Sequence, residues 1–307
     1  MKISVIGAGN VGATAANMIA LKGFASDVVL LDVKEGFAEG KAMDMMQTAH
    51  MLGFSTRITG VTGDYTETGN SAVIVITSGL ARRPGMTREE LVGKNAAIVQ
   101  SVMESCLKYS PEAVFIIVSN PADTLTYLAC RASGLPRTRV LGMSGLLDSS
   151  RFVYFLSQAL HCNPQDVNGM VIGVHGDHMV PLVRMADYNG VPVTALLSAG
   201  ELAQIAEDTR QGGGTLTRLL GTSAWYAPGT AIATMAEAIA LDSRRVLSCI
   251  AYLQGEYGEK DVCAAVPVVL GAQGIEDIVE ISLTADEKQQ FHTSTEKSRS
   301  VNQQLQV

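Results

Sequence analysis

The sequence predicts an α/β protein, with a doubly wound parallel sheet in its first half and an α+β domain in its second half. Short runs rich in Val and Ile alternate with longer stretches whose apolar residues recur at helical spacing, which predicts such a sheet. The short runs are apolar almost throughout, as parallel strands covered on both faces should be. Near Gly145 the alternation stops, which indicates a second domain. We therefore expect domains over residues 1–144 and 145–307.

The first domain contains alternating predicted strands and helices. The strands are expected at KISVI, DVVLL, TRITGV, SAVIVI and AVFIIV, within residues 2–6, 27–31, 56–61, 71–76 and 113–118. The helices are expected at residues 10–22, 36–52 and 87–107. Thr87 and Glu90 have the spacing of a capping box, so Thr87 is expected to cap the third helix.

The second domain has a different pattern. Helices are expected at residues 146–160, around 199–209 and 227–247, and at 284–305, with strands within 166–174 and 179–193. Residues 255–283 alternate as an antiparallel meander would, with glycines at plausible turns. The run QGGG, residues 211–214, is interpreted as a connection between helices.

Composition and charge exclude several classes of protein. The net charge of −7 disfavours nucleic acid or an anionic membrane as the main partner. Five widely spaced cysteines without a C-x-x-C indicate neither a disulfide framework nor a zinc site, and no metal is expected. No apolar run approaches the roughly 18 residues of a membrane-spanning helix, and no secretory signal is recognised at the start. A cytoplasmic location is expected.

The run GAGNVG has the G-x-G-x-x-G pattern and stands between the first strand and the first helix. It comprises Gly7, Ala8, Gly9, Asn10, Val11 and Gly12. Gly7 would permit a tight turn, Gly9 a close approach of backbone to a pyrophosphate, and Gly12 close packing of helix on sheet. Asp32 ends the next strand twenty residues after Gly12, where a carboxylate can accept hydrogen bonds from ribose hydroxyls. Because it would repel a 2′-phosphate, the pattern favours NAD over NADP and a Rossmann domain.

A second group of polar residues is spread along the chain. Asn120 follows a predicted strand, at the sheet edge where ligands bind in such folds. Asp148 and Arg151 are three residues apart and would share one helix face. An Asp can hold an imidazole in one tautomer, and an Arg matches a carboxylate bidentately. His175, which follows the strand GMVIG, would on its own be more typical of a hydrogen-bonded core histidine.

The segment TSGLARRPGMTREEL, residues 77–91, places Arg82, Arg83 and Arg88 in or beside a loop of an acidic protein. One interpretation is a solvated loop, because exposed arginine is ordinary. The other is a lid whose arginines close over an anion.

Taken together, GAGNVG with Asp32, SNP, LDSSRF and HGD resemble the lactate/malate dehydrogenase superfamily over essentially the whole chain. Within it, GLARRPGMTREELVGKN is similar to the malate dehydrogenases of the lactate-dehydrogenase-like type. The resemblance implies reversible hydride transfer between (S)-malate and NAD, giving oxaloacetate and NADH, and a place in the tricarboxylic acid cycle. It also implies a homo-oligomer, at least a dimer and expected to be a tetramer, partly through the helix at residues 36–52.

The resemblance also implies roles for individual residues. His175 would transfer the proton with Asp148 as its carboxylate partner, and Arg151 would clamp the C1 carboxylate. Arg88 would polarise the carbonyl and Asn120 would hold the reacting oxygen. Arg82, which matches a typical Gln in lactate dehydrogenases, would pair with the second carboxylate of a dicarboxylate. The expected cofactor-binding residues are Gly7, Ala8, Gly9, Asn10, Val11, Gly12, Asp32, Asn95, Val118, Ser119 and Asn120.

Other functions are left open by the sequence. An L-lactate dehydrogenase or another 2-hydroxy acid dehydrogenase would share most of these residues, although Arg82 argues against the first. A NAD-dependent glycosidase would need a metal-binding Cys and His pair that the sequence does not suggest. A non-catalytic NAD-binding protein would leave Asp148, Arg151 and His175 unexplained.

Overall fold

A computed structural model describes residues 1–80 and 88–303 of the chain, the side chains of residues 88 and 89 excepted. Within these residues, nine strands form one mixed sheet in the order β14-β13-β12-β6-β5-β4-β1-β2-β3. The pairs from β3 to β6 are parallel, and β1 lies between β2 and β4. The chain therefore builds the sheet outward from β1 in one direction and from β4 in the other. The carboxyl ends of these two strands flank the point where ligands bind in doubly wound sheets.

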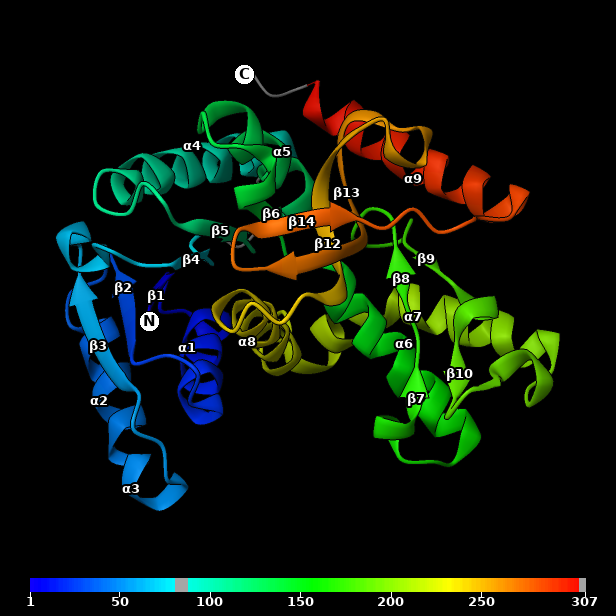
Figure 1. Cartoon of the computed structure of the whole chain (residues 1–307), viewed down its shortest axis with the longest axis horizontal. Coiled ribbons are helices and arrows are strands. Elements are labelled where there is room, and N and C mark those ends of the chain that lie inside the picture. The colour runs from blue at the N-terminus through cyan, green and yellow to red at the C-terminus, as the bar shows by residue number, and fades with distance from the viewer. Residues whose placement is uncertain (81–87, 304–307) are drawn as a thin grey trace.

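The first half of the chain follows the predicted alternation of strands and helices through residue 118 and continues it with a helix and a strand that were not predicted (Figure 1). Its elements are β1 (Lys2–Ile6), α1 (Asn10–Lys22), β2 (Asp27–Asp32), α2 (Phe37–Gln47), α3 (Ala49–Leu52), β3 (Arg57–Thr62), β4 (Val73–Ile76), α4 (Arg88–Leu107), β5 (Val114–Ile117), α5 (Ala122–Ala132) and β6 (Val140–Gly142). The predicted helix at residues 36–52 is divided at Thr48, where α2 ends and α3 begins.

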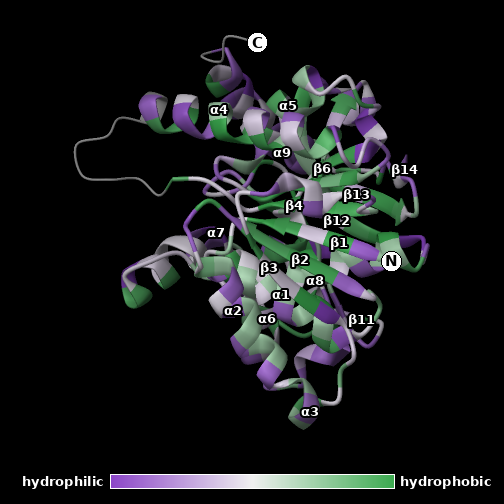
Figure 2. Cartoon of the chain, turned by 90° about the vertical axis from the view of Figure 1, so that its left-hand side faces the viewer, coloured by the Kyte–Doolittle hydropathy of each residue, from purple (hydrophilic) through white to green (hydrophobic). Residues whose placement is uncertain are grey.

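Helices cover both faces of the parallel part of the sheet. On one face, Ile3 and Val5 pack in a core with Ile19 of α1 and with a helix of the second half, α8 (Tyr226–Ala240). On the other face, Ile74 and Ile76 pack in a core with α4 and α5. Figure 2 shows the hydrophobic strands lying between these two layers. Burial on both faces accounts for the nearly continuous apolar character of the strand sequences.

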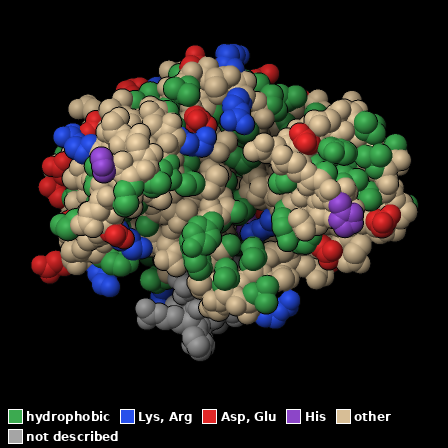
Figure 3. All heavy atoms as spheres, turned by 90° about the horizontal axis from the view of Figure 1, so that it is seen from below, with side chains coloured by type: hydrophobic (Ala, Val, Ile, Leu, Met, Phe, Trp, Pro, Cys, Tyr) green, Lys and Arg blue, Asp and Glu red, His purple; other side chains and the backbone are tan. Residues whose placement is uncertain are grey.

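The second half adds a separate lobe and three more strands of the sheet (Figure 1). Its remaining elements are α6 (Gly145–Leu160), β7 (Val167–Asn168), β8 (Val171–Ile172), β9 (Val180–Pro181), β10 (Asp187–Tyr188), β11 (Val191–Pro192), α7 (Ala199–Leu220), β12 (Arg245–Gln254), β13 (Lys260–Gly271), β14 (Gly274–Ile278) and α9 (Ala285–Asn302). The lobe has its own core, in which Phe152 and Leu156 of α6 pack with Leu202 and Ile205 of α7. Viewed from below, the surface is hollowed between the two lobes (Figure 3).

The predicted antiparallel meander is present, but it belongs to the main sheet. β12 pairs antiparallel with β13 and also with β6, where Ile250 lies opposite Gly142. The prediction of a helix over residues 227–247 is wrong beyond Ala240. Asp242 and Arg244 take positive φ and make the turn into β12, whose apolar residues are buried by pairing with neighbouring strands.

The interpretation of residues 211–214 as a connection between helices is also wrong, because these residues lie inside α7. α7 packs against α6 there: a Cβ on Gly212 would lie 3.3 Å from Cδ of Arg151. Each glycine costs about 1 kcal/mol relative to alanine in a helix interior, so packing against α6 outweighs this local preference. The predicted cap at Thr87 lies outside the described residues.

Candidate active site

The glycine loop connects β1 to α1 at the carboxyl edge of the sheet. Gly7 has φ of 107°, a conformation that residues with side chains rarely adopt. A Cβ on Gly12 would lie 1.9 Å from the carbonyl oxygen of Gly7, so only glycine allows the helix to start this close to the strand. By contrast, a Cβ on Gly9 would meet nothing within 4 Å. The loop is thus tightly packed at Gly7 and Gly12 and open at Gly9. An open position is needed where the backbone approaches a phosphate.

The carboxylate of Asp32 is fixed against this loop. Its Oδ2 accepts a hydrogen bond of 2.7 Å from the backbone N–H of Ala8, and its Oδ1 accepts one of 3.0 Å from that of Lys34. A cavity of about 350 Å³ opens beside it, with Leu31, Phe37, Tyr65, Leu80 and Ile98 among its lining residues. An apolar slot with a carboxylate at its rim suits an adenosine, whose base is apolar on its faces and whose ribose carries hydroxyls.

A second cavity of about 540 Å³ runs from the glycine loop into the second lobe. It collects most of the residues that the sequence suggested for cofactor and substrate. Its lining includes Gly9, Asn10, Val11, Gly12, Asn95, Val118, Ser119, Asn120, Arg151 and His175, together with Leu147 and, from the second half, Gly213, Thr217 and residues 222–224 and 228. The cavity therefore joins residues that are more than 150 positions apart in the chain.

Asn95 links the strand ends that border this cavity. Its side chain is buried, its Oδ1 accepts from the backbone N–H of Leu80 at 2.8 Å, and its Nδ2 donates to the carbonyl of Asn120 at 2.9 Å. Ser119 adds a further link, because its Oγ donates to the carbonyl of Ser78 at 2.5 Å. These bonds fix the backbone around Asn120 at the edge of the sheet.

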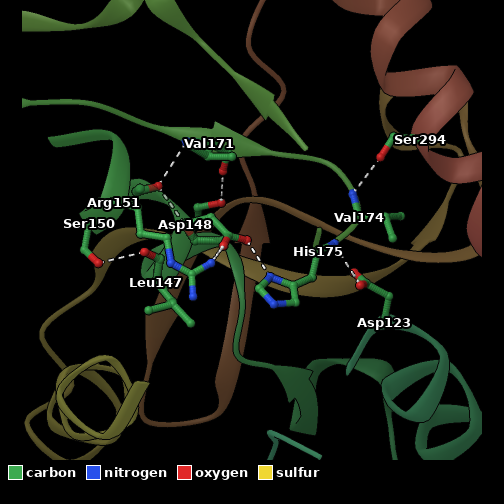
Figure 4. A network of polar contacts seen from close by, with 12 residues as sticks. Asp123, Leu147, Asp148, Ser150, Arg151, Val171, Val174, His175 and Ser294 are labelled. Atoms are coloured by element: carbon green, nitrogen blue, oxygen red, sulfur yellow. Dashed lines mark hydrogen bonds and ion pairs between the residues drawn. The ribbon is translucent and has the colours of Figure 1, made fainter. Parts of the chain in front are cut away.

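Asp148, Arg151 and His175 form a hydrogen-bonded group (Figure 4), and Arg151 and His175 line this cavity. Asp148 Oδ2 lies 2.9 Å from His175 Nδ1, and Asp148 Oδ1 accepts from Arg151 Nη1 at 3.0 Å. The spacing of Asp148 and Arg151 on α6 thus brings them together as predicted. The Asp148 side chain is only 2 % exposed, whereas the imidazole is 25 % exposed. Since a carboxylate accepts, Nδ1 carries the hydrogen, and Nε2 is left for a ligand.

The electrostatics of this group favour a protonated imidazole. The negative charge of Asp148 raises the pKa of His175 above its usual value, partly opposed by desolvation. Arg151 Nε is buried and has no hydrogen-bond partner among the described residues. Such an unsatisfied donor is costly unless a ligand completes it. The group can therefore hold an anion on the guanidinium and exchange a proton at the imidazole.

Two family models match the chain and together account for nearly all of it. Residues 1–142 match the lactate/malate dehydrogenase NAD binding domain, and residues 146–304 match the alpha/beta C-terminal domain of the same enzymes. The chain belongs to the lactate/malate dehydrogenase family. The predicted family, fold class and cofactor NAD are confirmed.

Individual relatives of this dehydrogenase family point to one branch. The malate dehydrogenase of Bacteroides thetaiotaomicron is 58% identical over 99% of this chain and 97% of its own length. That of Flavobacterium johnsoniae is 53% identical over 99% of this chain and 98% of its own length. The solved structure of the malate dehydrogenase from Salinibacter ruber superimposes with a TM-score of 0.95, at 46% identity, over 100% of this chain and 98% of that one. These relatives confirm the predicted enzyme class, a NAD-dependent dehydrogenase similar to malate dehydrogenases.

Lactate dehydrogenases share the same fold. The lactate dehydrogenase of Cryptosporidium parvum, solved with lactic acid and NAD, has a TM-score of 0.93 at 36% identity, over 98% of this chain and 96% of that one. The fold alone therefore does not distinguish lactate from malate as the substrate. Arg82, the residue expected to determine this specificity, lies outside the described residues, as does Arg83. The backbone of Arg88 begins α4, but its side chain is not described.

Sequence reasoning missed residues that hold the dehydrogenase's histidine in place. Asp123, in the first turn of α5, accepts from the backbone N–H of His175. Ser149, Ser248 and Ser294 also bond the backbone just before it. The signal that the sequence offered for Asp123 was its position, three residues after the predicted site residue Asn120. No pattern marks the serines, because only the fold brings them to this segment.

Two further observations concern metal binding and membrane-spanning helices. Among residues 1–80 and 88–303, no cluster of His, Cys, Asp and Glu could hold a metal ion. In the same part of the chain, no helix is long and apolar enough to span a membrane.

Proposed function

We propose that the chain catalyses the reversible, NAD-dependent oxidation of (S)-malate to oxaloacetate. The observation that carries the proposal is the group Asp148–His175–Arg151, which opens on the same cavity as the glycine loop. A proton carrier and an anion clamp thus stand beside the expected position of a nicotinamide. The malate dehydrogenases that match over the full chain support the choice of substrate.

The residues of the chain fit NAD. The glycine loop leaves room beside Gly9, its backbone N–H groups begin α1, and Asp32 stands at the edge of the adenosine-sized cavity. Gly7, Ala8, Asn10, Val11 and Gly12 complete the loop. The backbone of Val118, Ser119 and Asn120, with Asn95 behind it, would hold the nicotinamide end. When bound, NAD supplies a carbon that accepts or gives a hydride.

His175 would transfer the proton in each direction. In malate oxidation, Nε2 of the neutral imidazole takes the hydroxyl proton as hydride leaves C2. In oxaloacetate reduction the imidazolium returns that proton to the oxygen. Asp148 holds Nδ1–H and stabilises the imidazolium, so that the ring keeps one orientation throughout.

The arginines and Asn120 would bind and polarise the substrate. Arg151 would pair with the C1 carboxylate, for which its buried Nε and remaining N–H groups are suitable donors. Asn120 would hold the reacting oxygen, and Arg88 would place positive charge where the carbonyl oxygen becomes an alkoxide. Arg82 would pair with the second carboxylate. Pyruvate would leave this guanidinium unpaired, at a cost of about 3 to 5 kcal/mol if it is well desolvated.

Several broader features belong to the same proposal. We place the domain boundary between residues 144 and 145, supported by the model matches that end at 142 and restart at 146. We also propose a cytoplasmic enzyme that serves the tricarboxylic acid cycle.

We further propose a homo-oligomer, at least a dimer and most simply a tetramer. The exposure of Met43, Met51 and Leu52 on α2 and α3 supports this assembly. A monomeric mass in solution at micromolar concentration would refute it.

An activity assay tests the central proposal. NADH oxidation is followed with oxaloacetate and, separately, with pyruvate. Turnover with oxaloacetate and little with pyruvate is expected. Efficient turnover of pyruvate would favour a lactate dehydrogenase, and no turnover of either substrate would remove both assignments.

A further inference from the structure

The backbone that carries His175 is fastened by side chains from separate elements (Figure 4). Ser149 of α6 accepts from the N–H of Val171 at 2.9 Å, and Ser248 of β12 donates to the carbonyl of Val171 at 2.6 Å. Ser294 of α9 accepts from the N–H of Val174 at 2.8 Å. Asp123 of α5 accepts from the N–H of His175 itself at 2.9 Å.

Asp123 differs from the serines because it is a carboxyl group in a place where a neutral acceptor would satisfy the same N–H. Its side chain is buried, with the residue 3% exposed. Oδ2 makes the bond to His175, while Oδ1 is buried with no partner among the described residues. Burying a carboxylate with half of its acceptors unused is expensive compared with burying a hydroxyl. The ionised form of Asp123 therefore needs a positive group to compensate it.

The charged and titratable groups around His175 suggest that reason. Asp148 and Arg151 face it from α6, and Asp123 faces it from α5. Asp123 in turn lies within electrostatic range of Asp148 and of the buried thiol of Cys263 on β13. Among the described residues, the imidazolium of His175 is thus the positive group that can compensate the Asp123 carboxylate, because Arg151 is already paired with Asp148.

We propose that Asp123 is a positioning residue that acts as the second carboxylate of His175: its Oδ2 fixes the histidine backbone, and its charge helps to hold the imidazolium. This inference rests on the proposed role of His175 as the proton carrier. Asp148 would orient the ring at Nδ1, and Asp123 would act on the opposite, main-chain side of the residue.

The titration of the two groups agrees with this geometry. Burial raises the pKa of Asp123 to about 7, and the charge of His175 acts to lower it. In return, Asp123 contributes to the raised pKa of His175, after the larger effect of Asp148. Each group therefore favours the charged form of the other. Removing the Asp123 charge should lower the pKa of His175.

The test is the Asp123→Asn variant, whose amide oxygen can still accept from the His175 N–H. Oxaloacetate reduction needs the imidazolium, so kcat/KM declines above the pKa of His175. In the variant this decline should move to lower pH by at least about half a unit, and the rising limb of malate oxidation should move in the same direction. NADH binding should remain within about two-fold of the wild type.

The matched control is Ser294→Ala, which removes a neutral hydrogen bond to the same segment. It should lower kcat evenly across the pH range and leave the pH limbs in place. A wild-type pH profile for Asp123→Asn would overturn the inference and reduce Asp123 to a hydrogen-bond acceptor. A wild-type enzyme without oxaloacetate reductase activity would instead overturn the proposed function, so the two failures are distinguishable.

A spectroscopic measurement covers the case in which Asp123→Asn does not fold. Infrared titration of the Asp148→Asn variant, labelled at the Asp carboxyl carbon, should show a buried carboxyl that takes up a proton near neutral pH. Adding His175→Asn should move this titration to higher pH, because the compensating charge is gone. A titration that is absent, or that does not respond to removal of the imidazole, would refute the inference.

Discussion

Asp148→Asn is the substitution whose effect is best derived from the structure. The side chain is 2 % exposed and makes two bonds, to His175 Nδ1 at 2.9 Å and to Arg151 Nη1 at 3.0 Å. A hydrogen bond to a charged group contributes about 1.5 to 3 kcal/mol. In malate oxidation the bond to His175 strengthens as the imidazolium forms, so its loss falls on the transition state of that direction. At about 1.4 kcal/mol per tenfold in rate, kcat should fall by a factor of roughly 10 to 150.

The pH dependence should change in a defined direction. Asp148 is the largest cause of the raised pKa of His175, so the variant lowers that pKa. Oxaloacetate reduction should then lose activity at lower pH than in the wild type. The assays are steady-state malate oxidation, for the fall in kcat, and steady-state oxaloacetate reduction between about pH 5.5 and 9, for the pH limb, with NADH binding measured separately by fluorescence. Asp277→Asn, at an exposed carboxylate of β14, serves as the control. Unchanged kcat and an unchanged pH limb in Asp148→Asn would refute the assigned role of this carboxylate.

Three further substitutions, one of them with a matched control variant, test the other assignments. His175→Asn should lower kcat by about 10² to 10⁴ while NADH still binds, and near-normal turnover would remove His175 from the mechanism. The wild type should prefer NADH to NADPH by at least about tenfold in kcat/KM, and Asp32→Ser should narrow this ratio; equal use of both cofactors by the wild type would contradict the role of Asp32. Arg82→Gln should lower activity on oxaloacetate by about two decades and raise the low activity on pyruvate, measured against Arg83→Gln, which should leave the preference within a few-fold. Control of that preference by Arg83 would show that the register of the loop is misread.

The first domain was predictable because its local signals agree. Buried parallel strands are apolar throughout, and the close approach at Gly12 leaves a glycine that the sequence shows directly. The spacing of Asp148 and Arg151 likewise fixes their meeting on one face of α6. These features depend on residues close together in the chain.

The second half was less predictable because its structure depends on distant contacts. β12 continues a helical pattern in composition, yet its residues pair with β13 and β6. Gly212 looks like a helix breaker, but α7 needs a small residue where it passes Arg151. The bond from the His175 backbone to Asp123 joins positions 52 residues apart, so the sequence alone could not pair these two residues.

The most direct test of the proposed function is the ratio of kcat/KM for oxaloacetate to that for pyruvate, measured with NADH at one pH. Arg82 paired with a second carboxylate predicts a preference for oxaloacetate of about a hundredfold or more, from the cost of an unpaired guanidinium with pyruvate. A ratio near one, or a preference for pyruvate, would contradict the proposal that this chain is built for a dicarboxylate.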